Sequence, residues 1–132
     1  MKQLQEIICP IEVTLSIIGG KWKPMIVWWL LSGTKRFGEL RRLIPGVTQQ
    51  MLTAQLRELE QAQVLHRHVY AQVPPKVEYS LTECGRSLEP VILQLVAWGE
   101  WYDTQTDRKR QCLRDLSQKA EQLGDAEGVM AG

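Results

Sequence analysis

A proline-glycine turn between two amphipathic segments is the feature that most constrains this chain. The short helix predicted over residues 37–43 is followed by the turn Ile44-Pro45-Gly46-Val47, where proline and glycine interrupt helical periodicity. Thr48 suits a helix N-cap, because its hydroxyl can accept a hydrogen bond from a free backbone N–H. The helix predicted over residues 49–63 has an apolar face with i, i+4, i+7 spacing, made by Leu52, Leu56 and Leu59. Two helices joined by so tight a turn are typical of a helix-turn-helix unit.

Further segments flank this unit on both sides. Apolar spacing predicts one helix over residues 11–18, ended by Gly19-Gly20, and a second from about Lys21, with Pro24 in its first turn. After the unit, residues 64–70 and 77–81 are rich in β-branched and aromatic residues. The intervening loop contains Pro74 and Pro75, so we expect a β-hairpin.

The C-terminal third is predicted to be helical. Thr82 suits the N-cap of a long helix, in which Pro90 either produces a kink or marks the true start. Spacings of three and four residues then predict a short coiled-coil-like seam, formed by Leu113, Leu116, Ala120 and Leu123. Residues 124–132 have no periodicity and are expected to be disordered.

The order of these elements predicts a mostly α fold with a small β-hairpin, a winged helix-turn-helix. We expect residues 1–132 to form a single domain with the helix-turn-helix at about 37–63 and the wing at about 64–82. Terminal helices at about 9–19 and 83–123 are expected to mediate dimerisation. They carry Trp98, Trp101 and Tyr102, apolar surface that self-association would cover.

Local charge points to duplex DNA. The whole chain has a net charge of +1, but residues 34–57 contain five basic residues and a single acid, a net charge of +4. In a helix-turn-helix the N-terminal part of the second helix meets base edges in the major groove. The candidate base-reading residues are Thr48, Gln49, Gln50, Thr53 and Arg57, of which Arg57 could reach either a guanine or a phosphate. The candidate backbone contacts are Lys35, Arg36, Arg41, Arg67 and Lys76, of which Arg67 and Lys76 on the wing could instead touch the minor groove.

The same order of motifs resembles the HxlR-type family of bacterial regulators, which is similar to the MarR group. The resemblance covers roughly residues 9–102 and rests on Cys9-Pro10-Ile11-Glu12, Ile18-Gly19-Gly20-Lys21-Trp22-Lys23, Arg36-Phe37-Gly38-Glu39-Leu40, Ile44-Pro45-Gly46-Val47-Thr48-Gln49, Leu56-Arg57-Glu58-Leu59 and residues 73–82. Cys84 and the Gln-Ala-Gln at 61–63 depart from the usual residues. The resemblance implies a dimeric DNA-binding regulator, with its recognition helix at Thr48–Arg57 and its wing tip at 71–77.

Cys9 is the candidate redox sensor, since a cysteine commonly occupies this place in the family that the chain resembles. A sensing thiol needs a stabilised thiolate and exposure, and the alternative is a small buried residue at a helix start. The cysteines Cys9, Cys84 and Cys112 are too few and too widely spaced for a disulfide framework. His66 and His68 have a spacing that can bind metal, but without a third ligand we expect no metal site.

The sequence lacks the common catalytic motifs, so we expect neither an enzyme nor a cofactor. It has no signal-peptide layout and no long apolar run, which favours a cytoplasmic protein without a membrane partner. The predicted function is a homodimeric, sequence-specific regulator on a palindromic operator, with a small-molecule or oxidant effector as a candidate partner. Two alternatives stay open: a winged-helix module for protein–protein interaction, and a thiol-based small-molecule binder for which DNA is secondary.

Overall fold

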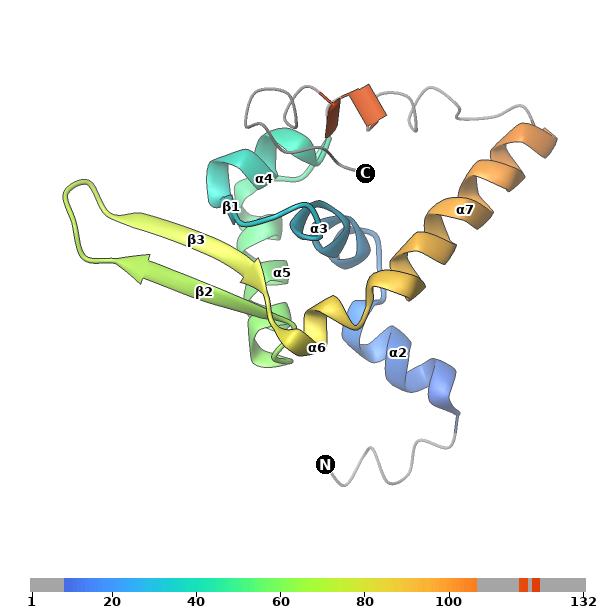
Figure 1. Ribbon diagram of the computed structural model, residues 1–132, viewed down its shortest axis with the longest axis horizontal. Helices are drawn as coiled ribbons and strands as arrows, with labels where there is room; N and C mark the ends of the chain where they lie inside the picture. Colours follow the sequence, from blue (N-terminus) through green and yellow to red (C-terminus); the bar gives the residue numbers. More distant parts are fainter. Residues whose placement is uncertain (1–8, 107–116, 119, 122–132) are drawn as a thin grey trace.

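The computed structural model describes residues 9–106, 117–118 and 120–121. Its helices and strands follow one another along the chain as shown in Figure 1: α2 (Pro10–Ile18), α3 (Trp22–Leu30), β1 (Lys35–Arg36), α4 (Phe37–Leu43), α5 (Gln49–Gln61), β2 (Leu65–Tyr70), β3 (Lys76–Leu81), α6 (Glu83–Arg86) and α7 (Glu89–Thr106). This arrangement is a winged helix-turn-helix, as the order of the sequence patterns predicted.

The helix-turn-helix unit consists of α4 and α5. Gly46 in the turn has φ +82°, a left-handed conformation that glycine adopts without a Cβ penalty. Thr48 is the N-cap of α5, and its Oγ1 accepts a hydrogen bond from the Met51 N–H at 3.1 Å. The turn chemistry and the cap predicted from the sequence are therefore both present.

Helix α3 lies at the centre of the core, where it contacts α4, α5, α7 and β3. Its Ile26 and Val27 are fully buried. The inward face of α5 packs against the same core through the three buried leucines that the spacing predicted, Leu52, Leu56 and Leu59. Lys23 of α3 also forms an ion pair with Glu58 of α5 at 2.5 Å. The position of α5 is thus tied closely to α3.

The sheet has three antiparallel strands in the order β1-β3-β2. Strands β2 and β3 form the expected hairpin, with Leu65 opposite Leu81 and Tyr70 opposite Lys76. The two-residue strand β1 was not predicted; it pairs with β3 through Lys35 opposite Tyr79. So short a strand has no periodicity of its own and is defined by a partner more than forty positions later in the chain.

The predicted long helix after Thr82 is divided into α6 and α7. Thr82 caps α6, since its Oγ1 accepts from the Gly85 N–H at 2.9 Å. Pro90 is the second residue of α7, which decides between the two alternatives: it marks where the long helix begins. Of the predicted seam, Ala120 packs against the core, while Leu113, Leu116, Leu123 and the predicted tail 124–132 lie outside the described residues.

Helix α7 is buried over a much narrower stripe than its apolar content suggests. Ile92 is 1% exposed, but the apolar residues Leu95, Trp98, Trp101 and Tyr102 are between 42% and 60% exposed. In Figure 1, α2 and α7 lie on the side of the molecule away from the β2–β3 wing. None of the helices in the described ranges combines the length and apolarity needed to cross a membrane.

Candidate nucleic-acid interface

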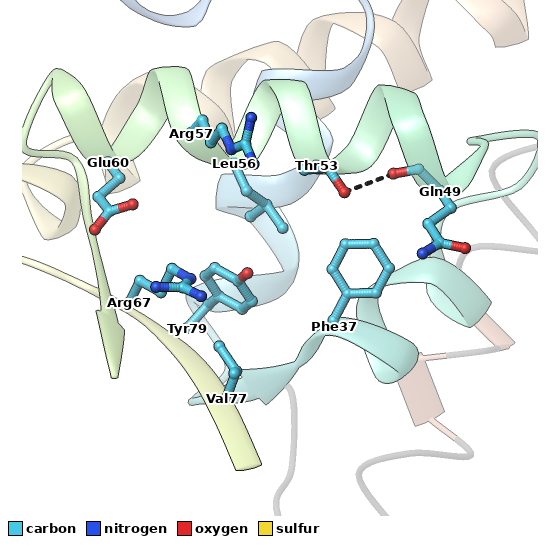
Figure 2. Close-up of a pocket in the computed structure, with 9 residues that line it drawn as sticks. All are labelled: Phe37, Gln49, Thr53, Leu56, Arg57, Glu60, Arg67, Val77 and Tyr79. Carbon is cyan, nitrogen blue, oxygen red and sulfur yellow. Dashed lines mark hydrogen bonds between the residues drawn. The ribbon is translucent and has the colours of Figure 1, made fainter. Parts of the chain in front are cut away.

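Helix α5 turns its polar residues away from the core. Gln49, Gln50 and Arg57 are exposed and Thr53 is half-buried. Thr53 Oγ1 donates to the Gln49 carbonyl oxygen at 2.8 Å, so its hydroxyl is already used within the helix while its methyl group stays available (Figure 2). The N-terminal part of α5 therefore presents two amide side chains and a methyl group on one exposed face.

A groove of about 460 Å³ separates this face from the sheet. Figure 2 shows residues of α5 on one side and residues of β2 and β3 on the other, with Phe37 closing one end. The lining residues are Phe37, Gln49, Thr53, Leu56, Arg57, Glu60, Arg67, Val77 and Tyr79. The groove thus brings together four predicted site residues from a helix and a strand: Gln49, Thr53 and Arg57 of α5, and Arg67 of β2. Its floor is apolar.

The single acid of the basic segment is directed to a helix end. Glu39 Oε1 accepts a hydrogen bond from the Arg36 backbone N–H at 2.8 Å, at the start of α4. A carboxylate in this position compensates the partial positive charge of the helix N-terminus. Arg36 and Arg41 remain exposed at the two ends of α4. The exposed positive charge around α4 is therefore carried by arginine side chains.

Lys35 is placed differently from the other predicted contacts. It is only 3% exposed, and its Nζ lies 3.2 Å from Ser32 Oγ and 3.5 Å from the Gly33 carbonyl oxygen. These contacts hold the ammonium at the C-terminal end of α3, where a positive charge is favourable. An ammonium buried in this way is not presented to a phosphate, so we leave Lys35 out of the interface.

On the wing, Lys76 is held against its neighbours. Its Nζ lies 3.4 Å from Glu78 Oε2 and 4.7 Å from the centre of the Tyr70 ring. The Tyr70 hydroxyl donates to Glu78 Oε1 at 3.0 Å, and this hydrogen bond, with desolvation and the nearby carboxylate charge, raises the pKa of Tyr70. Lys76 is half-buried, whereas Arg67 on β2 is exposed. The two predicted wing contacts therefore differ in how freely they can reach a ligand.

Phe37 and Glu60 line the groove, although neither was a candidate contact in the sequence. Phe37 is the first residue of α4, and its half-buried ring borders the groove. Glu60 was not considered, although it follows Arg57 by three residues on the helix where Gln49, Thr53 and Arg57 are spaced four apart. That helical period places Glu60 on the same face, so extending the face by one more turn would have found it.

Among the described residues, no cysteine or histidine belongs to the lining of this groove. Cys9 is the half-buried N-cap of α2, and its carbonyl oxygen accepts from the Glu12 N–H at 2.9 Å. Cys84 is exposed on α6. Within the described residues, no three side chains of the metal-ligating types gather closely enough to hold an ion.

The HxlR-like helix-turn-helix family model matches residues 17–107, which include every helix and strand from α3 to α7. The chain belongs to this HxlR-like family. By family it is a transcriptional regulator of the helix-turn-helix type, and the fold resemblance inferred from the sequence motifs is confirmed.

Relatives of this HxlR-like protein include HTH-type transcriptional regulators. It is 62% identical over 100 residues to the uncharacterized HTH-type transcriptional regulator YdeP of Bacillus subtilis (strain 168), covering 76% of this chain and 78% of YdeP. A solved structure of the redox regulator HypR in its reduced form has a TM-score of 0.72 and 54% identity, covering 76% of this chain and all of HypR. The reduced form of YodB from B. subtilis has a TM-score of 0.62 and 39% identity, covering 71% of this chain and 93% of YodB.

Proposed function

We propose that this HxlR-like protein binds duplex DNA sequence-specifically, with α5 as the recognition helix in the major groove. The observation that carries the proposal is the groove between α5 and the sheet, where the polar face of α5 meets a second arginine from β2. A recognition helix reads base edges with its N-terminal residues. Gln49 and Gln50 have the amide chemistry that pairs with adenine, and the Thr53 methyl suits thymine.

The two arginines of the groove are given different roles. Arg57 lies on α5 itself, two turns after the helix start, and can reach a guanine edge or a neighbouring phosphate. Arg67 lies on β2 and faces the groove from the sheet side, so we assign it to the sugar-phosphate backbone. Arg36 and Arg41, exposed on α4, and Thr48 at the N-cap of α5 complete the proposed contact surface.

We further propose that the protein acts as a homodimer through α2 and α7. On α7, Trp98 stacks on Tyr102 with ring centres 5.1 Å apart, and Trp101 lies 6.1 Å from Trp98. On α2, Ile11 and Leu15 are 66% and 59% exposed. Exposed apolar side chains gathered on two terminal helices are expected to be covered by a partner, and a second copy would supply the same surface. A two-fold dimer requires an operator with two inverted half-sites.

Duplex binding to DNA from around the protein's own gene, with random DNA as competitor, tests the main proposal. We expect binding that resists the competitor and weakens steeply between two salt concentrations, because phosphate contacts release counterions. Binding equal to that of random DNA, at every segment tried and under reducing and oxidising conditions, would instead favour the protein–protein interaction module.

We also propose that oxidation of the Cys9 thiol controls DNA binding. Cys9 begins α2, the helix that carries part of the proposed dimer surface, and the solved relatives include a redox regulator, HypR. Treatment with hydrogen peroxide, which oxidises a single thiol to a sulfenic acid and is itself reduced to water, should release DNA from the unaltered protein and from Cys84→Ser, which serves as the matched control. Cys9→Ser should stay bound, and equal release of all three proteins would contradict a role for Cys9.

A further inference from the structure

An apolar pocket of about 200 Å³ lies between α3 and α7, well away from the groove beside α5. One wall is formed by α3 and contains Pro24, Met25 and Trp28. The other is formed by α7, with Ser117 closing it from the C-terminal segment. The α7 residues that line it are Ile92, Leu95, Val96 and Glu100. A concave, largely apolar site with few polar groups is the usual form of a small-molecule pocket.

The one charged group among the described lining residues is the Glu100 carboxylate. Glu100 is exposed at the rim, and within the described part of the chain no hydrogen bond or ion pair engages it. Lys23, next to Pro24 in the sequence, is already paired with Glu58 at 2.5 Å. The pocket therefore combines an apolar interior with an uncompensated negative charge at its edge.

A second carboxylate lies further along the same helix, outside the lining of the pocket. Asp103 follows Glu100 by three residues, which places it on the same side of α7, about 4.5 Å further along the helix. Asp103 is only 6% exposed, and its Oδ2 has no hydrogen-bond partner in the described structure. Asp103 does not belong to the lining of the pocket, so the charge that a ligand in the pocket meets directly is that of the Glu100 carboxylate.

We propose that this pocket binds a small organic cation with a flat apolar body, such as an arylalkyl ammonium. The apolar body packs against Trp28, Met25 and Ile92, where a ring or an alkyl group loses its contact with water. The ammonium group lies at the Glu100 end and donates hydrogen bonds to its carboxylate. The size of the pocket suits a single-ring ligand, for which we expect a dissociation constant on the order of a millimolar or lower.

The position of the pocket gives such a ligand a regulatory consequence, which rests on the proposed function. Helix α3 is tied to the recognition helix through the Lys23–Glu58 ion pair and the shared core, while α7 carries the proposed dimer surface. Leu95 belongs both to the pocket and to the exposed apolar face of α7. Ligand binding between α3 and α7 therefore biases the orientation of the recognition helix relative to the dimer axis.

Binding is tested on the full chain without DNA, so that the result does not depend on the proposed operator. Three probes share a phenyl ring and a short chain but differ in charge: 2-phenylethylammonium, 2-phenylethanol and 3-phenylpropanoate. Calorimetry should show the highest affinity for the cation, a lower affinity for the neutral probe and the lowest for the anion. Two-dimensional NMR should show a shift of the Trp28 indole resonance, assigned with Trp28→Phe. Equal or stronger binding of the neutral or anionic probe, or no binding of any probe, would overturn the proposal.

Two variants of α7 refine the test. Glu100→Gln should weaken the cation by about fivefold and leave the neutral probe unchanged, because a rim ion pair contributes modestly. Glu89→Gln removes an exposed carboxylate of the same helix outside the pocket and should change neither affinity. Loss of cation affinity in both variants to the same extent would show a non-specific charge effect and would contradict the assignment to Glu100.

The regulatory consequence has its own readout. Saturating 2-phenylethylammonium should change the affinity for the operator in the unaltered protein, and 2-phenylethanol at the same concentration should change it less. If the cation binds but DNA affinity stays constant, the pocket stands and its coupling to DNA is wrong. If specific DNA binding is absent altogether, the calorimetric result still decides the pocket.

Discussion

Arg57 on α5 and Arg67 on β2 line the same groove, one from the helix and the other from the sheet (Figure 2). They are ten positions apart in the chain, and they belong to elements with different periodicity. If α5 enters the major groove, these two guanidinium groups meet the same stretch of duplex from different directions. Their substitution is therefore the most direct way to separate base reading from backbone contact.

Arg57→Ala should weaken operator binding by about 1–3 kcal/mol and reduce the preference for operator over random DNA, because a base contact is lost. Arg67→Ala should weaken both DNAs alike and lower the salt slope by about one, as expected for one phosphate contact. Fluorescence anisotropy at several salt concentrations measures both quantities. Equal losses on operator and random DNA for Arg57→Ala would refute its base-reading role.

Lys35→Ala should affect stability rather than the salt dependence of DNA binding. Its ammonium contacts Ser32 Oγ and the Gly33 carbonyl oxygen, and its aliphatic stem is buried. We expect the free energy of unfolding in urea to fall by about 1–2 kcal/mol, from lost packing and hydrogen bonding. Arg36→Ala, at the exposed neighbouring position, should change stability by less than about 0.5 kcal/mol. A reduced salt slope in Lys35→Ala would show that the lysine does reach a phosphate.

Gly85→Ala should destabilise the protein by about 2 kcal/mol, because the added Cβ would lie 2.1 Å from the Val64 carbonyl oxygen. That carbonyl also accepts from the Thr82 N–H at 3.0 Å, so it cannot move away without breaking the contact between the N-cap of α6 and the loop that joins α5 to β2. Gly99→Ala is the control, since nothing lies within 4 Å of its Cβ position inside α7. There alanine should be neutral or stabilising by up to about 1 kcal/mol. If both variants melt at the same temperature, the close approach of the Val64 carbonyl oxygen to Gly85 would be contradicted.

Trp98→Glu with Trp101→Glu should shift the proposed dimer to monomer. Two carboxylates in an apolar interface are desolvated without partners, and the dimer dissociation constant should rise at least about a hundredfold. Analytical ultracentrifugation over a range of protein concentrations measures the change. Val73→Glu, at a wing-tip residue that is 98% exposed, is the control and should leave assembly unaltered. A double variant that sediments like the unaltered protein would place the dimer surface elsewhere.

Local patterns were enough to predict the helix-turn-helix unit. Thr48 caps α5, Leu52 and its two partners at i+4 and i+7 are buried, and Gly46 occupies a left-handed turn. Each of these properties depends on residues within one or two helical turns, so the sequence of that segment is sufficient. The same holds for the hairpin and for the start of α7 at Pro90, although there the sequence left two alternatives open.

Only the tertiary structure decided the properties that depend on distant partners. Strand β1 exists because Lys35 and Arg36 pair with β3, and the same placement buries the Lys35 side chain that its charge had assigned to DNA. The groove joins Arg57 to Arg67 because α5 packs on the core beside the sheet, and the pocket joins Trp28 to Glu100 because α3 and α7 meet. Periodicity gives the face of one element, whereas a site formed by two elements depends on how they pack together.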